Sequence, residues 1–482
     1  MGKLKGEVTV FLSLIMVVML GFVGALIQSS KYNMDKVYQR NQVEMATESV
    51  FAEYHRTLFK EFHIFALEAT YEAGQYQMEN IRDRLLFYGA NHVNWEITQQ
   101  QQLSDCNGAT LEEQIITYMK QKYGITKLQY LLGESSNWEL QREEGEAVVQ
   151  QLQENEVELE QQVVDQEGSL AEAGNPLPQL SQARAGGILN LVMADRNSIS
   201  DGQVELTELP SHRTLQTGIH SYEVSQEHNA MSKILLVEYA LEHFHAAVNQ
   251  QSDSDLAKTN STNINQANMN SVNTDAVDGV EGLSYEIEYL LEGHSSDREN
   301  LKAVLNKVLM MRVGINYACL MKSPTKRAEA SAMALTIATA STLPVLQPIV
   351  EQALLLGWAY GESIVDIRGL MKGGRIPIMK TDANWQLGIQ GLFQLGTESD
   401  QQDGANNQEG LCYKDYLRML LYMENKDRLL MRQMDMIEQR LRYVEQLSYF
   451  RIDYCLTQLQ FTNTSYLMGG FTYEYPVAFT YR

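Results

Sequence analysis

Val8 to Ile27 reads VTVFLSLIMVVMLGFVGALI, an uncharged and almost wholly apolar run near the start of the chain. About twenty residues rise roughly 30 Å as a helix, which matches the hydrocarbon core of a bilayer. Only a helix satisfies every backbone polar group there. A cleavable signal peptide has a shorter apolar core followed by a small-residue cleavage site, whereas this run leads into Gln28-Ser-Ser-Lys31. We therefore expect a retained, single-pass membrane anchor at residues 8–27.

The orientation of the anchor follows from the lengths of the flanking segments more than from their charge. Lys3 and Lys5 precede the run, but Lys31 and Lys36 follow it, so the positive-inside bias is modest. The tail of residues 1–7 is very short, and nearly all of the 482 residues lie on the other side. We expect a cytoplasmic tail and an extracytoplasmic bulk at the cell membrane.

The segment 28–73 has no proline or glycine, and it is expected to continue the membrane helix as a stalk. Its apolar residues recur at spacings of three and four, which predicts one buried stripe formed by Val43, Ala46, Val50, Tyr54 and Leu58. A stalk that packs on its own domain and a stalk that binds a partner helix are both compatible with this stripe.

Polar residues near the membrane mouth and along the stalk are the best candidates for a role in assembly. Glu7 stands directly before the apolar run, and Glu48, Glu53 and His55 lie within the stalk. Glu48, Ala52 and His55 would share one face of a continuous helix. A solvated, salt-bridged face is the alternative to a functional one.

Composition excludes several classes of function. A hydrophobic content of 44% is enough for globular cores, and the formal net charge of −23 argues against nucleic-acid binding. The four cysteines stand far apart without a C-x-x-C pair, so no zinc or redox motif is present. One or two disulfides and buried free thiols both stay open.

The region 74–249 is predicted to be variable and α-rich. Residues 92–98 alternate as a half-buried strand, and 111–168 has helical periodicity, with Val149, Leu152, Leu159 and Val163 at coiled-coil-like spacing. A helix is expected over 222–248. Residues 250–279 are rich in Asn, Ser, Thr, Gln and Asp, a composition typical of a disordered linker or loop.

The region 280–482 is predicted to be an α+β domain. Alternation from Leu283 to Tyr289 indicates a strand, and helices follow over 297–321, 324–342 and 344–371. The last two helices are strongly apolar, but prolines and glutamates interrupt every candidate membrane window, which favours a buried helical core.

Alternation predicts two paired strands at the carboxyl end, over 450–456 with a bulge near Gln458, and over 471–482. Pro476 cannot donate to a ladder, so the final strand should lie at an edge of the sheet. The fold class is therefore α+β and mostly helical: a long amino-terminal transmembrane and stalk helix, then a helical module with a small antiparallel sheet that includes the carboxyl-terminal strands.

The chain carries no motif of nucleophilic, metal-dependent or phosphate-binding catalysis in the context that each would need. Glu238, Glu242 and His245 would share one face of the helix predicted over 222–248, in the pattern of half a di-iron carboxylate site. A second such helix is missing, so a polar outer face is favoured. We expect no catalytic, cofactor-binding or metal-binding residues, and no enzymatic activity.

Four stretches of the chain resemble a known family. They are KGEVTVFLSL at 5–14, ESVFAEYHR at 48–56, WAYGESIVDIRGL at 358–370 with GGRIPIMK at 373–380, and YKDYLRMLL at 413–421. They resemble an uncharacterised family of single-anchor membrane proteins from Gram-positive, clostridia-like bacteria. Those proteins accompany Tad (tight adherence) pilus genes and are similar to TadE and TadG pseudopilins at the amino terminus.

The resemblance implies a membrane-anchored, non-enzymatic structural or assembly component of a Tad-like pilus or cell-surface apparatus. It implies the lipid bilayer and other pilus or secretion components as partners, and no nucleic acid. Gly2 and Glu7 have the spacing of a prepilin peptidase site, but a cut after Gly2 would leave Lys3 and Lys5 on the mature end. The alternative is a membrane-tethered extracytoplasmic enzyme or ligand-binding protein.

Overall fold

The computed structural model describes residues 4–90, 94–123, 186–193, 199–219, 230–248, 282–341, 344–397, 410–467 and 470–481, together with Ala147, Gln150, Glu154 and Asn406. Two compact units divide the chain. Unit 1 comprises Met1–Gln114, Thr214–Gln226 and Leu447–Arg482, and unit 2 comprises Ile115–Arg213 and Glu227–Gln446. The first and last parts of the chain therefore belong to the same unit.

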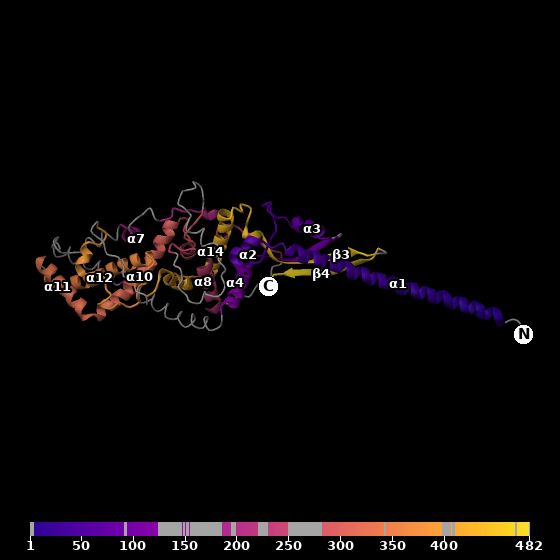
Figure 1. Cartoon of the computed structure of the whole chain (residues 1–482), viewed down its shortest axis with the longest axis horizontal. Helices are drawn as coiled ribbons and strands as arrows, with labels where there is room; N and C mark the ends of the chain where they lie inside the picture. The colour runs from indigo at the N-terminus through magenta and orange to yellow at the C-terminus, as the bar shows by residue number, and fades with distance from the viewer. Residues whose placement is uncertain are drawn as a thin grey trace. The chain divides into compact units, whose positions relative to one another are not determined.

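Unit 1 begins with the long helix α1, Leu4–Phe51. Figure 1 shows that its amino-terminal part extends alone, while β3 and β4 run beside its carboxyl-terminal part. Within the described residues, α1 holds the one helix segment that is long and apolar enough to cross a membrane. From Val8 to Ile27 its large apolar side chains are all exposed, which is the state expected of a helix whose natural surroundings are lipid.

The helix ends at Phe51, and the prediction of an unbroken stalk helix to residue 73 is wrong. The Phe51 ring stacks on Phe479 with ring centroids 4.3 Å apart, and Phe51 O accepts a hydrogen bond from the Tyr481 hydroxyl. After two turn residues, the His55 N–H donates to Ala66 O. Contacts with the last strand thus end the helix where the local sequence carries no helix breaker.

The sheet of unit 1 is antiparallel and is built around its longest strand. β3, Cys455–Tyr466, pairs with β2, Trp95–Gln102, and with β4, Thr472–Thr480, while β1, Leu67–Glu68, pairs with the start of β3. The register between Gln101 and Gln102 skips Thr457, which confirms the bulge predicted near Gln458. The strand predicted over 450–456 is wrong in its first part, because Ile452–Tyr454 forms a 3₁₀ turn.

Pro476 lies on the outer edge of β4, as the sequence predicts. The Tyr481 N–H donates to Thr457 O at 3.0 Å, and the Leu467 N–H donates to Phe471 O at 2.8 Å. Antiparallel partners alternate, so the odd-numbered residues of β4 bond to β3 and the N of Pro476 points away from it. Since β4 pairs with β3 alone among the described strands, a missing donor there weakens the edge as a template for another strand.

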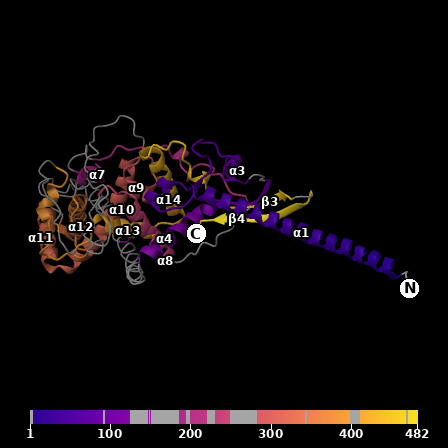
Figure 2. The ribbon, with the colours of Figure 1, turned by 45° about the vertical axis from the view of Figure 1, so that its right-hand side comes forward.

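The core of unit 1 lies between α1 and this sheet. Val43, Ala46 and Val50 are buried on α1, which confirms the first three positions of the predicted stripe. They share a hydrophobic cluster with residues of three strands and of α3, Met78–Phe87. Leu58 is buried too, but on the separate helix α2, Arg56–Phe62. Figure 2 shows the β3–β4 hairpin along α1 from a second direction.

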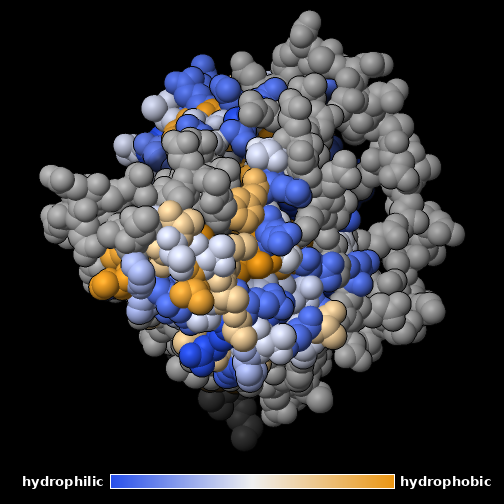
Figure 3. Space-filling view, turned by 90° about the vertical axis from the view of Figure 1, so that its left-hand side faces the viewer, coloured by the Kyte–Doolittle hydropathy of each residue, from blue (hydrophilic) through white to orange (hydrophobic). Residues whose placement is uncertain are grey.

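Unit 2 is a helical assembly around α12, Gln347–Met371. Its neighbours are α10, Asp297–Lys322, and α11, Pro324–Ala340, so the three helices predicted here are confirmed. Nearly every residue of α12 from Ala353 to Leu370 is buried. The small residues Ala330, Ala334 and Ala338 form the buried face of α11. On the end of the molecule where α11 lies, Figure 3 shows hydrophobic residues scattered among hydrophilic ones.

The strand predicted over Leu283–Tyr289 is wrong, because helix α9, Glu286–Glu292, begins within it, and Glu286 and Glu288 are buried. Glu286 accepts hydrogen bonds from Arg440 and from the His245 N–H, and Glu288 accepts one from the Tyr413 hydroxyl at 2.9 Å. A glutamate that has such partners can be buried, so its polarity does not mark a solvent-facing position.

Shorter elements complete both units. The helices are α4, Asp105–Lys122; α7, Ile188–Val192; α8, Ala230–His243; α13, Tyr413–Met423; and α14, Lys426–Gln439. A π-helical turn, Arg440–Val444, follows α14, and 3₁₀ turns occur at Leu206–Glu208, Pro344–Leu346 and Ile389–Phe393. All four cysteines are present as thiols.

Several predictions fall outside the described residues. They are the coiled-coil-like stripe at 149–163, the linker over 250–279, and the first part of the helix expected over 222–248. Within the described part, the predicted strand 92–98 corresponds to β2, which starts at Trp95 and continues to Gln102.

Replacement of Phe461 by alanine should destabilise unit 1 by about 3–5 kcal/mol, because the side chain is fully buried in the middle of β3 and its loss leaves a cavity. Thermal unfolding of the detergent-solubilised full chain measures the effect. Thr462→Ala, at the next and only partly buried position, is the control and should cost about 1 kcal/mol or less. Equal effects of the two substitutions would contradict this placement of the core.

Candidate functional site

A pocket of about 640 Å³ lies in unit 1 where α1 ends. Its walls come from the end of α1, the start of α2, the turn after β1, and α3, with Leu447 and Tyr449 closing one side. Polar and aromatic side chains converge there, including Glu53, His55, Glu68, Tyr71, Arg84 and Tyr88. Two of the sequence candidates, Glu53 and His55, thus meet at the same pocket.

Glu53 is held by two side chains of the α3 region. Arg84 Nε donates to Glu53 Oε2 at 3.0 Å, and the Tyr88 hydroxyl donates to Glu53 Oε1 at 2.7 Å. The Arg84 guanidinium also lies over the rings of Tyr71 and Tyr88, 5.5 Å from each centroid. A carboxylate with these bonds is fixed in place and contributes to attaching α3 to the end of α1.

The floor of the pocket is a strained turn. Tyr71 and Glu72 have φ values of 49° and 68°, in the left-handed region. Glu68 stabilises the turn, since its carboxylate accepts the backbone N–H groups of Thr70, at 2.9 Å, and of Glu72, at 3.1 Å. Such strain persists only where surrounding contacts impose it, and it is common at binding sites.

Two tyrosine hydroxyls of the pocket stay protonated at physiological pH. Burial raises the pKa of Tyr71 far above its usual range, and burial together with the charges of Glu72 and Glu68 raises the pKa of Tyr449 to about 12. The buried Tyr71 hydroxyl has no hydrogen-bond partner among the residues that the structure describes. It is therefore an unsatisfied buried donor at the edge of the pocket.

The His55 side chain caps the start of α2. Its Nδ1 accepts the Leu58 N–H at 3.1 Å, so His55 is the amino-terminal cap of α2. Burial lowers the pKa of His55 to about 4, which keeps the ring neutral at physiological pH. A neutral imidazole whose Nδ1 already accepts a bond is poorly placed to act as a general base.

The described lining of the pocket has no histidine hydrogen-bonded to a hydroxyl. Ser49 donates to Met45 O on its own helix, and the His55 ring accepts the Leu58 N–H. Among the described lining residues, no hydroxyl shares a hydrogen bond with the histidine. The ligand-binding alternative therefore rests on the strained turn and on Tyr71.

The structure separates the other candidates in unit 1. Glu7 and Glu48 are exposed on α1, and neither lines the pocket. The expectation that Glu48, Ala52 and His55 share one helical face is wrong, because α1 ends at Phe51 before that face is complete. Ala52 and His55 nevertheless both reach the pocket.

Glu238, Glu242 and His245 do not form a common site either. Helix α8 ends at His243, so His245 lies beyond it and the expected shared face is wrong in its last position. Arg418 binds Glu238, Lys122 binds Glu242, and Glu286 binds His245. No group of three metal-ligating side chains occurs within the described ranges.

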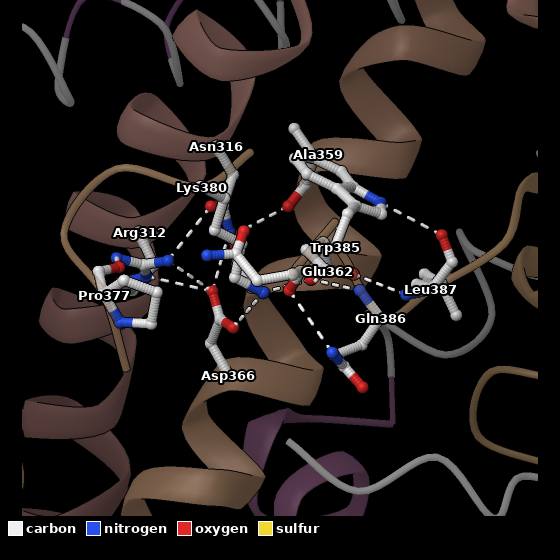
Figure 4. Close-up of polar contacts among 12 residues, drawn as sticks. Arg312, Asn316, Ala359, Glu362, Asp366, Pro377, Lys380, Trp385, Gln386 and Leu387 are labelled. Carbon is white, nitrogen blue, oxygen red and sulfur yellow. Dashed lines mark hydrogen bonds and ion pairs between the residues drawn. The ribbon is translucent and has the colours of Figure 1, made fainter. Parts of the chain in front are cut away.

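Unit 2 contains a buried ionic cluster, which Figure 4 shows in close-up. Arg312 of α10 binds Asp366 of α12 through Nε at 3.0 Å and Nη2 at 2.6 Å. Lys380, from the loop after α12, pairs with Glu362 and with Asp366, the latter at 2.5 Å. All four side chains are at most 2% exposed. Two cations and two carboxylates cancel in charge, as burial requires.

Further hydrogen bonds tie the cluster to the loop backbone. Arg312 Nη1 donates to Pro377 O and Ile378 O, both at 3.1 Å, and Glu362 accepts the N–H groups of Gln386 and Leu387. Burial raises the pKa of Glu362, and Lys380 opposes this rise in part. Because the cluster is closed to solvent, its role is to hold the loop on α10 and α12 rather than to bind a substrate.

Gly361 allows the same loop to approach α12. A Cβ at this position would lie 2.6 Å from Leu387 Cδ2 and 2.9 Å from Leu392 Cδ2. The Trp358 indole, one turn earlier, donates to Leu387 O at 2.7 Å. The sequence WAYGESIVD is therefore a packing and clamping surface for the loop that follows it.

The sequence alone does not predict which side chains contact Glu53 in the pocket, or which cations pair with the carboxylates of the ionic cluster. Tyr71, Arg84 and Tyr449 of the pocket are distant from Glu53 in sequence, and no local pattern joins them. For the cluster a signal existed: Glu362 and Asp366 stand four residues apart in an apolar helix, and such carboxylates need buried cations. The pattern does not reveal which cations those are.

The stability of unit 1 should fall as the pH drops from about 6.5 to about 4. The pKa of His55 is lower in the folded state than in the unfolded state. The stability that neutral His55 contributes is therefore fully present above pH 6.5, the unfolded pKa, and is lost as the pH falls to about 4, the folded pKa. Protonation would also remove the acceptor of the helix cap. His55→Asn keeps a cap acceptor without titrating there, and it should flatten thermal-unfolding temperature against pH in the full chain. An unchanged pH profile in this variant would contradict the assignment.

Asp366→Ala should destabilise unit 2 by about 3–5 kcal/mol, because it leaves Arg312 and Lys380 buried with one carboxylate between them. The measurement is denaturant unfolding followed by tryptophan fluorescence, since Trp358 and Trp385 flank the clamped loop. Asp382→Ala, at an exposed position in the same loop, is the matched control and should change stability little. A small effect at Asp366 would show that the cluster is hydrated.

Comparisons with known proteins identify a family but assign no activity to it. A family model with the description "Family of unknown function (DUF5702)" matches residues 166–466, well over half of the 482 residues. The matched range contains the ionic cluster of unit 2 and all of β3, whereas α1 and the pocket residues up to Tyr88 precede it. Neither the curated proteins nor the solved structures gave a match. The chain belongs to this family of unknown function, DUF5702.

Proposed function

We propose that this protein is a membrane-anchored, non-enzymatic structural or assembly component of a cell-surface apparatus, of the Tad-like pilus type. It stands in the cell membrane through α1, with the amino terminus in the cytoplasm and both units outside. The observation that carries the proposal is that one helix, α1, has two different parts. Its apolar part from Val8 to Ile27 is exposed, here called the bare part, and its end from Val43 to Phe51 is buried against unit 1, here called the packed part.

The bare part supports anchoring. Exposed fractions of the large apolar side chains between Val8 and Ile27 range from 39% at Ile15 to 69% at Val17. Their contact with water would be costly at about 25 cal/mol per Å² of apolar surface. Insertion in a bilayer or packing against other transmembrane helices would remove this cost.

The packed part supports a mechanical role. The segment from Val43 to Phe51 is embedded between strands and α3, so the anchor and the sheet of unit 1 form one rigid body. A force on the outer part of unit 1 would reach the membrane through a continuous helix, without a flexible linker between them. Such a connection suits a subunit or assembly factor of a surface structure better than it suits a freely diffusing enzyme.

The pilus assignment comes from the resemblance of the segments at 5–14 and 48–56 to a Tad-associated, clostridia-like family with pseudopilin-like amino termini. Glu7 stands at the mouth of the apolar helix, where pilins carry a glutamate that is thought to meet the terminal amine of a neighbour. In this chain Glu7 is exposed, so it is available for a neighbouring helix.

Deletion of the gene should abolish surface fibres or adherence, and the wild-type protein should co-purify with pilus machinery. Complementation with Glu7→Ala should fail to restore fibres if Glu7 contacts a neighbouring subunit. Glu79→Ala, at an exposed glutamate on α3, should restore them and serves as the control. Electron microscopy and membrane fractionation are the readouts. Normal fibres in the deletion strain would contradict the proposed function, and full rescue by Glu7→Ala would remove the pilin analogy for that residue.

A further inference from the structure

The end of the β3–β4 hairpin lies against α1 directly after the membrane-spanning segment. The ring of Phe471 meets the ring of Tyr32 edge to face, with centroids 5.8 Å apart. On the other arm, Tyr466 O accepts a hydrogen bond from Gln39 Nε2 at 3.3 Å. Figures 1 and 2 both show the hairpin directed along α1 toward its amino-terminal half. These contacts lie within unit 1.

The height of this contact can be placed from the geometry of the helix. Tyr32 is five residues beyond Ile27, which is about 7–8 Å along an α-helix at 1.5 Å per residue. The headgroup region adds about 5–8 Å to each side of the hydrocarbon core. If residues 8–27 fill the core, Tyr32 and Phe471 lie at the level of the lipid headgroups.

The aromatic residues near the end of the hairpin are exposed, unlike the inward-facing residues farther along β4. Phe471 is 61% exposed and Tyr466 is 63% exposed, whereas Tyr475 is 2% and Val477 3% exposed. The inner face of β4 is therefore buried under α1 except near the hairpin end. Aromatic side chains are enriched at membrane interfaces, where their rings contact lipid and their polar groups contact water.

Positive charge accompanies the exposed rings. Lys36 Nζ lies 4.6 Å from the ring centroids of both Tyr32 and Tyr473, and Lys31 is exposed one turn before it. The chain has a formal net charge of −23, so its general field disfavours phosphate. A local pair of lysines at headgroup height offsets this repulsion, since each contributes about 1 kcal/mol near an anionic membrane surface.

We propose that the end of the β3–β4 hairpin is a second membrane contact of this protein. Phe471 enters the lipid interface beside Tyr32 of α1, and Lys31 and Lys36 bind headgroup phosphates. This contact goes beyond anchoring by the helix, although it rests on the proposed insertion of residues 8–27. A second contact beside the helix fixes the height and tilt of unit 1 on the bilayer, which a single spanning helix leaves variable.

Lipids with bromine at the headgroup end of the acyl chains test the contact, because this bromine quenches tryptophan at the lipid interface. The full chain is reconstituted in vesicles of phosphatidylcholine and phosphatidylglycerol, and the signal of the 4 native tryptophans is subtracted. Phe471→Trp should lose at least half of its added fluorescence in brominated vesicles. Ala478→Trp, at an exposed position of the same strand about 20 Å farther from the hairpin end, should lose none.

Leu14→Trp, within the spanning segment, separates the two proposals. Strong quenching at residue 14 without quenching at residue 471 would retain the anchor and overturn the hairpin contact. Absence of quenching at both positions, with no co-flotation of protein and vesicles, would overturn insertion and the contact together. A Phe471→Trp signal that shifts to the blue but is not quenched would indicate a second copy of the chain on the hairpin end, and would also overturn the lipid contact.

Discussion

The packing of the last turns of α1 against the final strand is the interaction on which the rest of unit 1 depends. Phe51 stacks on Phe479 and accepts a hydrogen bond from Tyr481 through its carbonyl, so the first fifty residues are joined to the last ten. This contact ends the helix, starts the turn that forms the pocket, and closes the sheet around β3. It also makes the anchor rigid, because a helix embedded on one side at Val43 and Val50 cannot rotate about its own axis without exposing that stripe.

In unit 2, buried ion pairs hold the loop after α12 in place. Burial of Arg312, Lys380, Glu362 and Asp366 gains little net free energy, since desolvation offsets most of the attraction between them. What the cluster does provide is one position for the loop after α12, because any other position would leave a buried charge without a partner. That the family-matched range contains this cluster agrees with a shared scaffold. The candidate pocket lies in unit 1 and is built by residues that precede the matched range or fall within its last part.

The polar residues near the pocket act mainly on the fold. His55 caps α2, Glu53 fastens α3, and Glu68 holds the Tyr71–Glu72 turn, so the chemistry of these groups is already used within the protein. The proposed function therefore rests on architecture: an exposed apolar helix, its packed junction with the sheet, and a hairpin end that we propose to lie at the height of the headgroups. These three features all concern how unit 1 stands on a membrane, and together they describe a component held in a defined orientation.

By itself, the sequence determined the apolar span, the three helices from Asp297 to Met371, the two faces of the final strand and the edge position of Pro476. Each of these follows from a local hydrophobic periodicity or from one residue with a strong backbone constraint. Only the tertiary structure decided that α1 ends at Phe51 and that 286–292 is a helix. It also decided that Glu238 binds Arg418 whereas His245 binds Glu286. These outcomes depend on partners hundreds of residues away. A buried polar residue and an exposed one look alike in sequence, because the difference lies in the partner that the fold brings to it.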